Sequence, residues 1–349
     1  MQIDRNNNFD LIRLLAAMQV LLWHGAVHLG VIERLGIFKE IIFQLPGVPI
    51  FFTISGFLIS YSLERSRGDF KKYFRNRFLR IYPALVLCTI FTASLMFGFG
   101  IIQNGFDFLK WIAAQLTFFQ FYSPQSLKNW GVGHPNGSLW SIAVEIQFYL
   151  LLPLLFFIIH FFKKNWQKNV FLIACFLISI GFKKYIGNST TFQENIIASK
   201  LAGNTVLFYL HFFITGIFIF VNFEFLRKHL EGKIFFWGGV YVIYTLIFAS
   251  WLGWYVYPYD INLAGIIANC ILSLFVISAA FSYNSLSKNI LHENDISYGL
   301  YIYHMPIVNS LITLGMLGGF LDWLLLIFLT ILVSVFSWRI VERKALKLK

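Results

Sequence analysis

The stretch from Phe9 to Leu29 combines the length of a membrane span with four ionisable side chains, those of Asp10, Arg13, His24 and His28. Counted along an α-helix, the step from Arg13 to His24 is three turns plus about 20°, so both side chains lie on one face. A charge inside a bilayer costs about 2.5–3.5 kcal/mol. A single buried histidine would be an ordinary structural residue, whereas a face with four ionisable groups predicts a functional cavity.

A basic and aromatic segment, residues 70–83, contains Arg77 and Arg80 three positions apart. Such residues are neighbours on one helical face, and planar guanidinium groups bind anions through paired hydrogen bonds. An anchor to anionic lipid would explain the lysines of this segment. It explains less well why these two arginines lie inside the aromatic run, so we predict an anion site there.

Glu145 is the one acid of the apolar segment 138–161. It lies roughly 10 Å inside that segment, and His24 lies roughly 9 Å from the outer end of its own segment. The two side chains are therefore predicted at the same depth. Because an acid in a membrane span needs a partner, we predict that Glu145 orients the imidazole of His24 or favours its charged form.

Three other features were weighed for a structural or a functional role. Tyr301 and His304 share a slowly drifting stripe of the segment 296–316, on its cytoplasmic half. His211 has no obvious acid partner and is interpreted as structural. Gly56 is explained as well by close helix packing as by its neighbour Ser55 lining a cavity.

The composition is that of a membrane protein, with 58% hydrophobic and 13% charged residues. We predict an all-α, polytopic fold with about ten transmembrane helices, each formed by a run of roughly 20 apolar residues. One membrane-embedded domain is expected over residues 1–349, with no appended extracytoplasmic domain and no cleavable signal. The predicted spans are 10–30, 41–63, 79–102, 138–161, 170–187, 204–222, 233–253, 261–281, 296–316 and 320–340.

The net charge of +12 reflects topology and not nucleic-acid binding. With ten spans, 21 of the 28 Lys and Arg residues fall on the side that holds both termini. The positive-inside rule makes that side cytoplasmic. The three cysteines lie in predicted spans without paired spacing, and no HExxH pattern occurs, so we expect no metal.

Five motifs in this order resemble the acyltransferase family 3 membrane proteins, which include bacterial O-acetyltransferases that modify surface polysaccharides. The motifs are FDLIRLLAAMQVLLWH, FFTISGFLIS, RNRFLRIYPAL, GSLWSIAVEIQFYLLLP and ISYGLYIYHMP, and the resemblance covers essentially the whole chain. It implies a bacterial inner-membrane enzyme that transfers an acyl group, usually acetyl, from cytoplasmic acyl-CoA to a hydroxyl of a cell-surface or lipid-linked glycan. Members of the family with a further extracytoplasmic domain also exist.

The resemblance assigns roles to the polar residues. Arg13 and His24 match the family's Arg/His pair, Arg77 and Arg80 its Arg-x-x-Arg motif, and Glu145 its fourth-span acid. We expect His24, supported by Glu145, to act as general base on the acceptor hydroxyl. The arginines are expected to hold the phosphates of the acyl-CoA, with Tyr301 and His304 as further donor-binding residues.

Two other functions are alternatives to an acyltransferase. A transporter or flippase for a glycan or lipid-linked intermediate would also need polar helix faces and a broken helix. However, the halves of the chain show no internal repeat. A membrane scaffold would leave the buried His24 and Glu145 unexplained.

Overall fold

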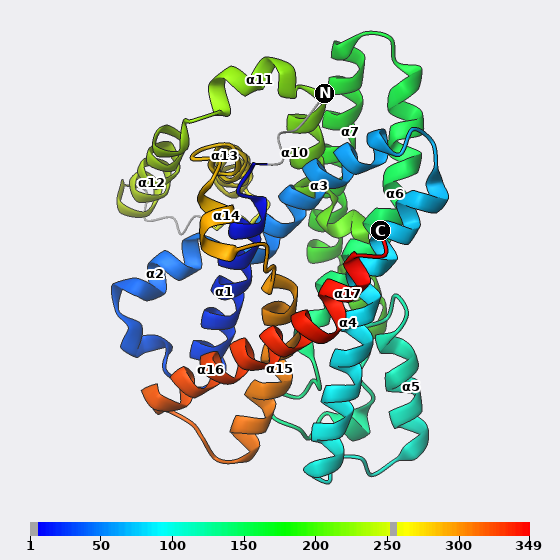
Figure 1. Cartoon of the computed structure of the whole chain (residues 1–349), viewed down its shortest axis with the longest axis vertical. Coiled ribbons are helices and arrows are strands. Elements are labelled where there is room, and N and C mark those ends of the chain that lie inside the picture. The colour runs from blue at the N-terminus through cyan, green and yellow to red at the C-terminus, as the bar shows by residue number, and fades with distance from the viewer. Residues whose placement is uncertain (1–5, 252–256) are drawn as a thin grey trace. The chain divides into compact units, whose positions relative to one another are not determined.

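The computed structural model describes residues 6–251 and 257–349, and every regular element within those ranges is a helix (Figure 1). The predicted all-α fold is therefore confirmed. The chain forms two compact units, each assembled from separate stretches. Unit 1 comprises the chain as far as Arg13, Val48–Phe70 and Val144–Glu293, and unit 2 comprises Leu14–Gly47, Lys71–Ala143 and Asn294–Lys349.

The helices α1 (Phe9–His28) and α6 (Trp140–Phe161) are divided between the two units, and the first residues of α3 and α4, Gly47 and Phe70, belong to the other unit than the rest of their helices. The remaining helices of unit 1 are α3 (Gly47–Arg65), α7 (Asn165–Asn188), α8 (Thr190–Glu194), α9 (Ile196–Gly203), α10 (Val206–Val221), α11 (Phe223–Leu230), α12 (Ile234–Trp251), α13 (Leu263–Ala280) and α14 (Leu286–Leu291). Those of unit 2 are η1 (Ile32–Leu35), α2 (Ile37–Gln44), α4 (Phe70–Gly98), α5 (Gly105–Gln115), η2 (Gln125–Leu127), η3 (Gly137–Leu139), α15 (Ser297–Thr313), α16 (Phe320–Ser337), the π-helix η4 (Trp338–Glu342) and α17 (Arg343–Leu346).

In unit 1, glycines allow two helices to approach at backbone distance. A Cβ atom at Gly56 of α3 would overlap the carbonyl oxygen of Phe213 in α10, and one at Gly216 of α10 would overlap that of Thr53. Small residues permit such contacts between membrane helices. The packing interpretation of Gly56 is thus the one that the structure supports.

In unit 2, α15 packs against α16, and Gly299 lies against the Ser334 side chain. The indole nitrogen of Trp323, at the start of α16, donates to the carbonyl of Leu22 in α1 at 3.2 Å. The α1 and α15 segments that carry the polar motifs are therefore connected to one supporting helix.

Eight helices are long and apolar enough to cross a membrane, or nine if the bent pair α11–α12 forms one span. This range comes from the described residues. The sequence predicted about ten spans. One of the predicted spans absent from this set is α15, which has 17 residues, whereas a straight span needs about 20. The last two positions of the predicted span 233–253 lie outside the described residues, as does the N-terminal Arg5.

Candidate active site

The structure brings His24 of α1 together with His304 of α15 in unit 2. The Nδ1 atom of His24 lies 2.9 Å from the Nε2 atom of His304, and the two rings stack with centroids 5.2 Å apart. His304 is completely buried, whereas the His24 side chain is partly exposed. One ring nitrogen of His24 is thus held by the protein while part of the side chain stays exposed.

A proline explains how α15 is fixed around this pair. Pro306 has no backbone N–H, so the carbonyl of Ile302 loses its intrahelical donor. The Asn136 side-chain amide donates to that carbonyl at 2.8 Å, and the Cys88 thiol approaches it at 3.2 Å. The loop before η3 and the helix α4 are thereby both bound to α15, two positions before His304.

Tyr301 extends the same set of contacts. Its hydroxyl group hydrogen-bonds with the hydroxyl of Ser141 and with the carbonyl of Ser138. The Tyr301 side chain is buried, as is that of His304. Direct contact of either residue with an acyl donor stays a prediction.

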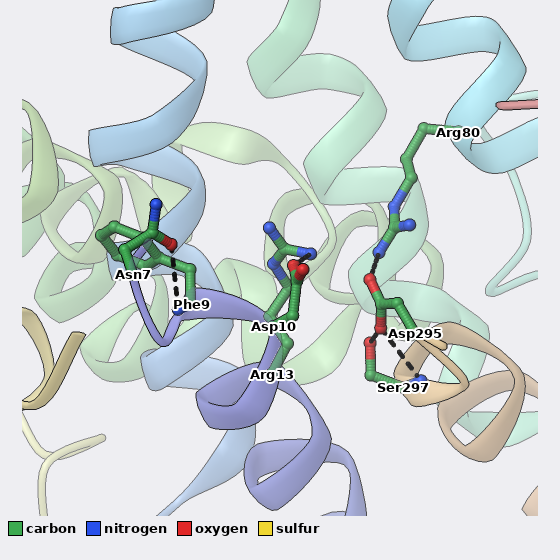
Figure 2. Close-up of polar contacts among 7 residues, drawn as sticks. All are labelled: Asn7, Phe9, Asp10, Arg13, Arg80, Asp295 and Ser297. Atoms are coloured by element: carbon green, nitrogen blue, oxygen red, sulfur yellow. Dashed lines mark hydrogen bonds and ion pairs between the residues drawn. The ribbon is translucent and has the colours of Figure 1, made fainter. Parts of the chain in front are cut away.

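Arg80 of α4 forms an ion pair with Asp295 of the same unit, with 2.7 Å between Nη2 and Oδ2 (Figure 2). The other carboxylate oxygen of Asp295 accepts hydrogen bonds from the backbone N–H and the hydroxyl of Ser297, at the first turn of α15. Asp295 therefore holds the Arg80 guanidinium at a defined position. Arg77 lies one turn earlier on α4, and both arginine side chains are partly exposed.

Glu145 has two hydroxyl partners within unit 1. Its Oε1 atom accepts from Ser55 at 2.8 Å and from Tyr149 at 2.6 Å. Two hydroxyl donors stabilise a carboxylate in a membrane span, where an unsatisfied charge is costly. The pairing of Glu145 with His24 stays a prediction.

Arg13 lies in the first turns of α1 and pairs with Asp10 at 2.8 Å (Figure 2). The Asp10 side chain is exposed. An acid and a base three positions apart on one helix form such a pair readily. This ion pair explains why an acid and a base occur together near one end of the helix, and the explanation requires no ligand.

Sequence reasoning missed several partners that the structure supplies. Tyr149 lies four positions after Glu145, so helical spacing could have indicated it. Asp295 and Arg80 are separated by 215 positions, and His24 and His304 by 280, so no local pattern could have paired them. Among the described residues, no group of three or more His, Cys, Asp or Glu side chains is arranged to hold a metal ion.

Comparison with known proteins identifies the class to which this membrane helix bundle belongs. A family model described as an acyltransferase domain matches residues 6–339. The chain is 32% identical to nodulation protein 10 of Rhizobium leguminosarum bv. viciae, over 98% of this chain and 94% of that protein. It is 26% identical to the O-acetyl transferase of Shigella phage Sf6, over 99% of this chain and 97% of the phage protein.

A further relative is the O-acetyltransferase OatA of Staphylococcus aureus, which is 27% identical over 85% of this chain. The chain spans about half of that protein, 51% of its length. No solved structure matches. The chain belongs to the acyltransferase family 3, as its motifs predicted.

Proposed function

We propose that this protein is an acyl-CoA-dependent O-acyltransferase that modifies a hydroxyl of a cell-surface or lipid-linked glycan, with acetyl as the expected acyl group. The observation that carries the proposal is the acyltransferase-domain match across residues 6–339, with proteins named as O-acetyltransferases among the relatives. These relatives favour an enzyme over a transporter or flippase. The chain is proposed to act as one membrane-embedded domain.

His24 is proposed as the general base. The acceptor oxygen attacks the acyl carbon while its proton moves to a ring nitrogen of His24, the carbon–sulfur bond breaks, and the departing thiolate takes that proton. The partial exposure of His24 and its fixed Nδ1 contact support this role. Glu145 is proposed to favour the charged imidazole, with its own carboxylate fixed by Ser55 and Tyr149.

Arg77 and Arg80 are proposed to bind the phosphates of the donor, with Arg13 as an additional cation. The orientation of Arg80 by Asp295 supports a preformed anion site, because less side-chain entropy is lost when a fixed guanidinium binds. The donor would then enter from the cytoplasmic side of a bacterial inner membrane, on which both termini are proposed to lie.

The direct test is mass spectrometry of surface glycans from cells with and without this protein, grown with isotopically labelled acetate. We expect one labelled acetyl group per modified sugar only when the protein is present. Purified protein in vesicles should also release free CoA from acetyl-CoA when the glycan acceptor is supplied. Identical glycan masses in both cell lines, with the protein present in the membrane, would contradict the proposal.

A further inference from the structure

The contact between His24 and His304 has a defined direction of hydrogen bonding. His304 Nδ1 lies 3.2 Å from the carbonyl oxygen of Leu300, one turn earlier on α15. A carbonyl oxygen only accepts hydrogen bonds, so Nδ1 of His304 must carry the proton. In a neutral imidazole the other nitrogen, Nε2, then carries a lone pair.

That lone pair fixes the proton of the neighbouring ring. Nε2 of His304 lies 2.9 Å from Nδ1 of His24, a hydrogen-bond distance at which one of the two atoms must donate. Since Nε2 of His304 is the acceptor, Nδ1 of His24 carries a hydrogen. The Nε2 atom of neutral His24 is then left with a free lone pair.

We infer that His304 is a positioning residue, which holds His24 in the Nδ1–H tautomer so that Nε2 serves as the base toward the acceptor hydroxyl. This inference rests on the proposed function for its catalytic meaning. It gives His304 a role other than the donor contact that the sequence predicted. The complete burial of His304 agrees with the new role, because a side chain with no exposed surface can act through its neighbour.

The hydrogen bond from His24 to His304 also becomes stronger as the reaction proceeds. When Nε2 of His24 takes the acceptor proton, the ring becomes a cation, and its Nδ1–H bond to His304 becomes charge-assisted. An interaction stronger in the transition state than in the ground state accelerates the reaction. Neutral His304 would thus accept the hydrogen bond from Nδ1–H of His24 while Nε2 of His24 acts as the base.

The burial and anchoring of α15 keep this acceptor in place. The carbonyl of Ile302, freed by Pro306, is bound by Asn136, and the Tyr303 hydroxyl donates to Ser337 at 3.1 Å. Both contacts lie within two positions of His304 on its own helix. The ring therefore has a fixed backbone from which to accept the His24 proton.

The tautomer can be measured without any substrate. Protein labelled with ¹⁵N-histidine, in bilayers at alkaline pH where both imidazoles are neutral, should show His24 protonated at Nδ1 and unprotonated at Nε2. The His24 signals are assigned by their loss in His24→Gln. His304→Gln, which offers an amide oxygen as acceptor, should keep this tautomer, and His304→Phe should lose it.

Activity provides the second readout, with acetyl-CoA as donor and the acetyl content of surface glycans as product. His304→Gln should retain transfer to within about tenfold, and His304→Phe should lose about 10²-fold in kcat with an unchanged KM for acetyl-CoA. His160→Gln is the matched control, because His160 makes the same contact with the carbonyl four positions earlier, that of Phe156, on the exposed side of α6. It should remain at the wild-type rate.

Three results would overturn the inference. The first is a wild-type His24 protonated at Nε2, and the second is a His24 tautomer unchanged in His304→Phe. The third is a His304→Phe protein with a raised KM for acetyl-CoA and an unchanged kcat, which would restore donor binding as its role. If wild-type protein acetylated no glycan but showed the expected tautomer, the proposed function would fail and the hydrogen-bond assignment would stand.

Discussion

At the scale of single residues, three of the proposed chemical groups have a partner that fixes their orientation within their own unit. His24 contacts His304, Arg80 contacts Asp295, and the carboxylate of Glu145 accepts from Ser55 and Tyr149. A base, an anion-binding cation and an acid that are held in place lose little entropy when a substrate binds.

The arginine pair leads to a prediction about donor affinity. The double change Arg77→Lys and Arg80→Lys keeps the charge but removes planar, bidentate donors. Hydrogen bonds to charged groups contribute about 1.5–3 kcal/mol each, so the Kd for acetyl-CoA should rise at least tenfold. Isothermal titration of the purified protein measures it.

Arg75→Lys is the control for this experiment. Arg75 lies on the same helix and donates to the backbone carbonyl of Leu348, so its replacement should leave donor affinity unchanged. If the double Lys variant bound acetyl-CoA like wild type, Arg77 and Arg80 would be lipid anchors and not a phosphate site.

At the scale of helices, the sequence predicted the positions of the helices better than it predicted which side chains contact one another. Apolar runs of about 20 residues locate helices because each must satisfy its backbone within the membrane. Most predicted spans coincide with α-helices of the described residues, whereas the predicted span 41–63 runs across the break between α2 and α3. Contacts such as His24 with His304 depend on how helices pack. No periodicity along the chain encodes that arrangement.

The α3–α10 contact gives a prediction about stability. Gly56→Ala should force α3 and α10 apart, because the added methyl group overlaps the Phe213 carbonyl, and overpacking typically costs about 1–3 kcal/mol. A lowered thermal unfolding midpoint in detergent is the expected result. Gly239→Ala, in α12 with no atom within 4 Å of the added methyl, should leave the midpoint unchanged or raise it. Equal midpoints for the two variants would show that α3 and α10 do not need this close approach.

At the scale of the whole molecule, both units draw on stretches that are distant in the sequence. Spans can be counted from composition because hydropathy is local, but membership of a unit depends on tertiary contacts. The orientation in the membrane is a further property of the complete chain, and the distribution of Lys and Arg predicts it.

Orientation can be tested with a pair of introduced cysteines. Asn129 is exposed in the loop before η3 and is predicted to face outward, so Asn129→Cys should react with an impermeant thiol reagent in intact cells. Lys164→Cys, in the predicted cytoplasmic loop before α7, should react only after permeabilisation. The reverse pattern would invert the proposed topology.

The central claim is that His24 is the base of an acyl transfer, and the acyltransferase rate of His24→Ala tests it most directly. Positioned general-base catalysis contributes about 10²–10⁴-fold, so acetylation of surface glycan per molecule of membrane-inserted His24→Ala protein should fall by that factor. His160→Ala, expressed at the same level, should remain at the wild-type rate. A His24→Ala protein that acetylates glycan at nearly the wild-type rate would contradict the account.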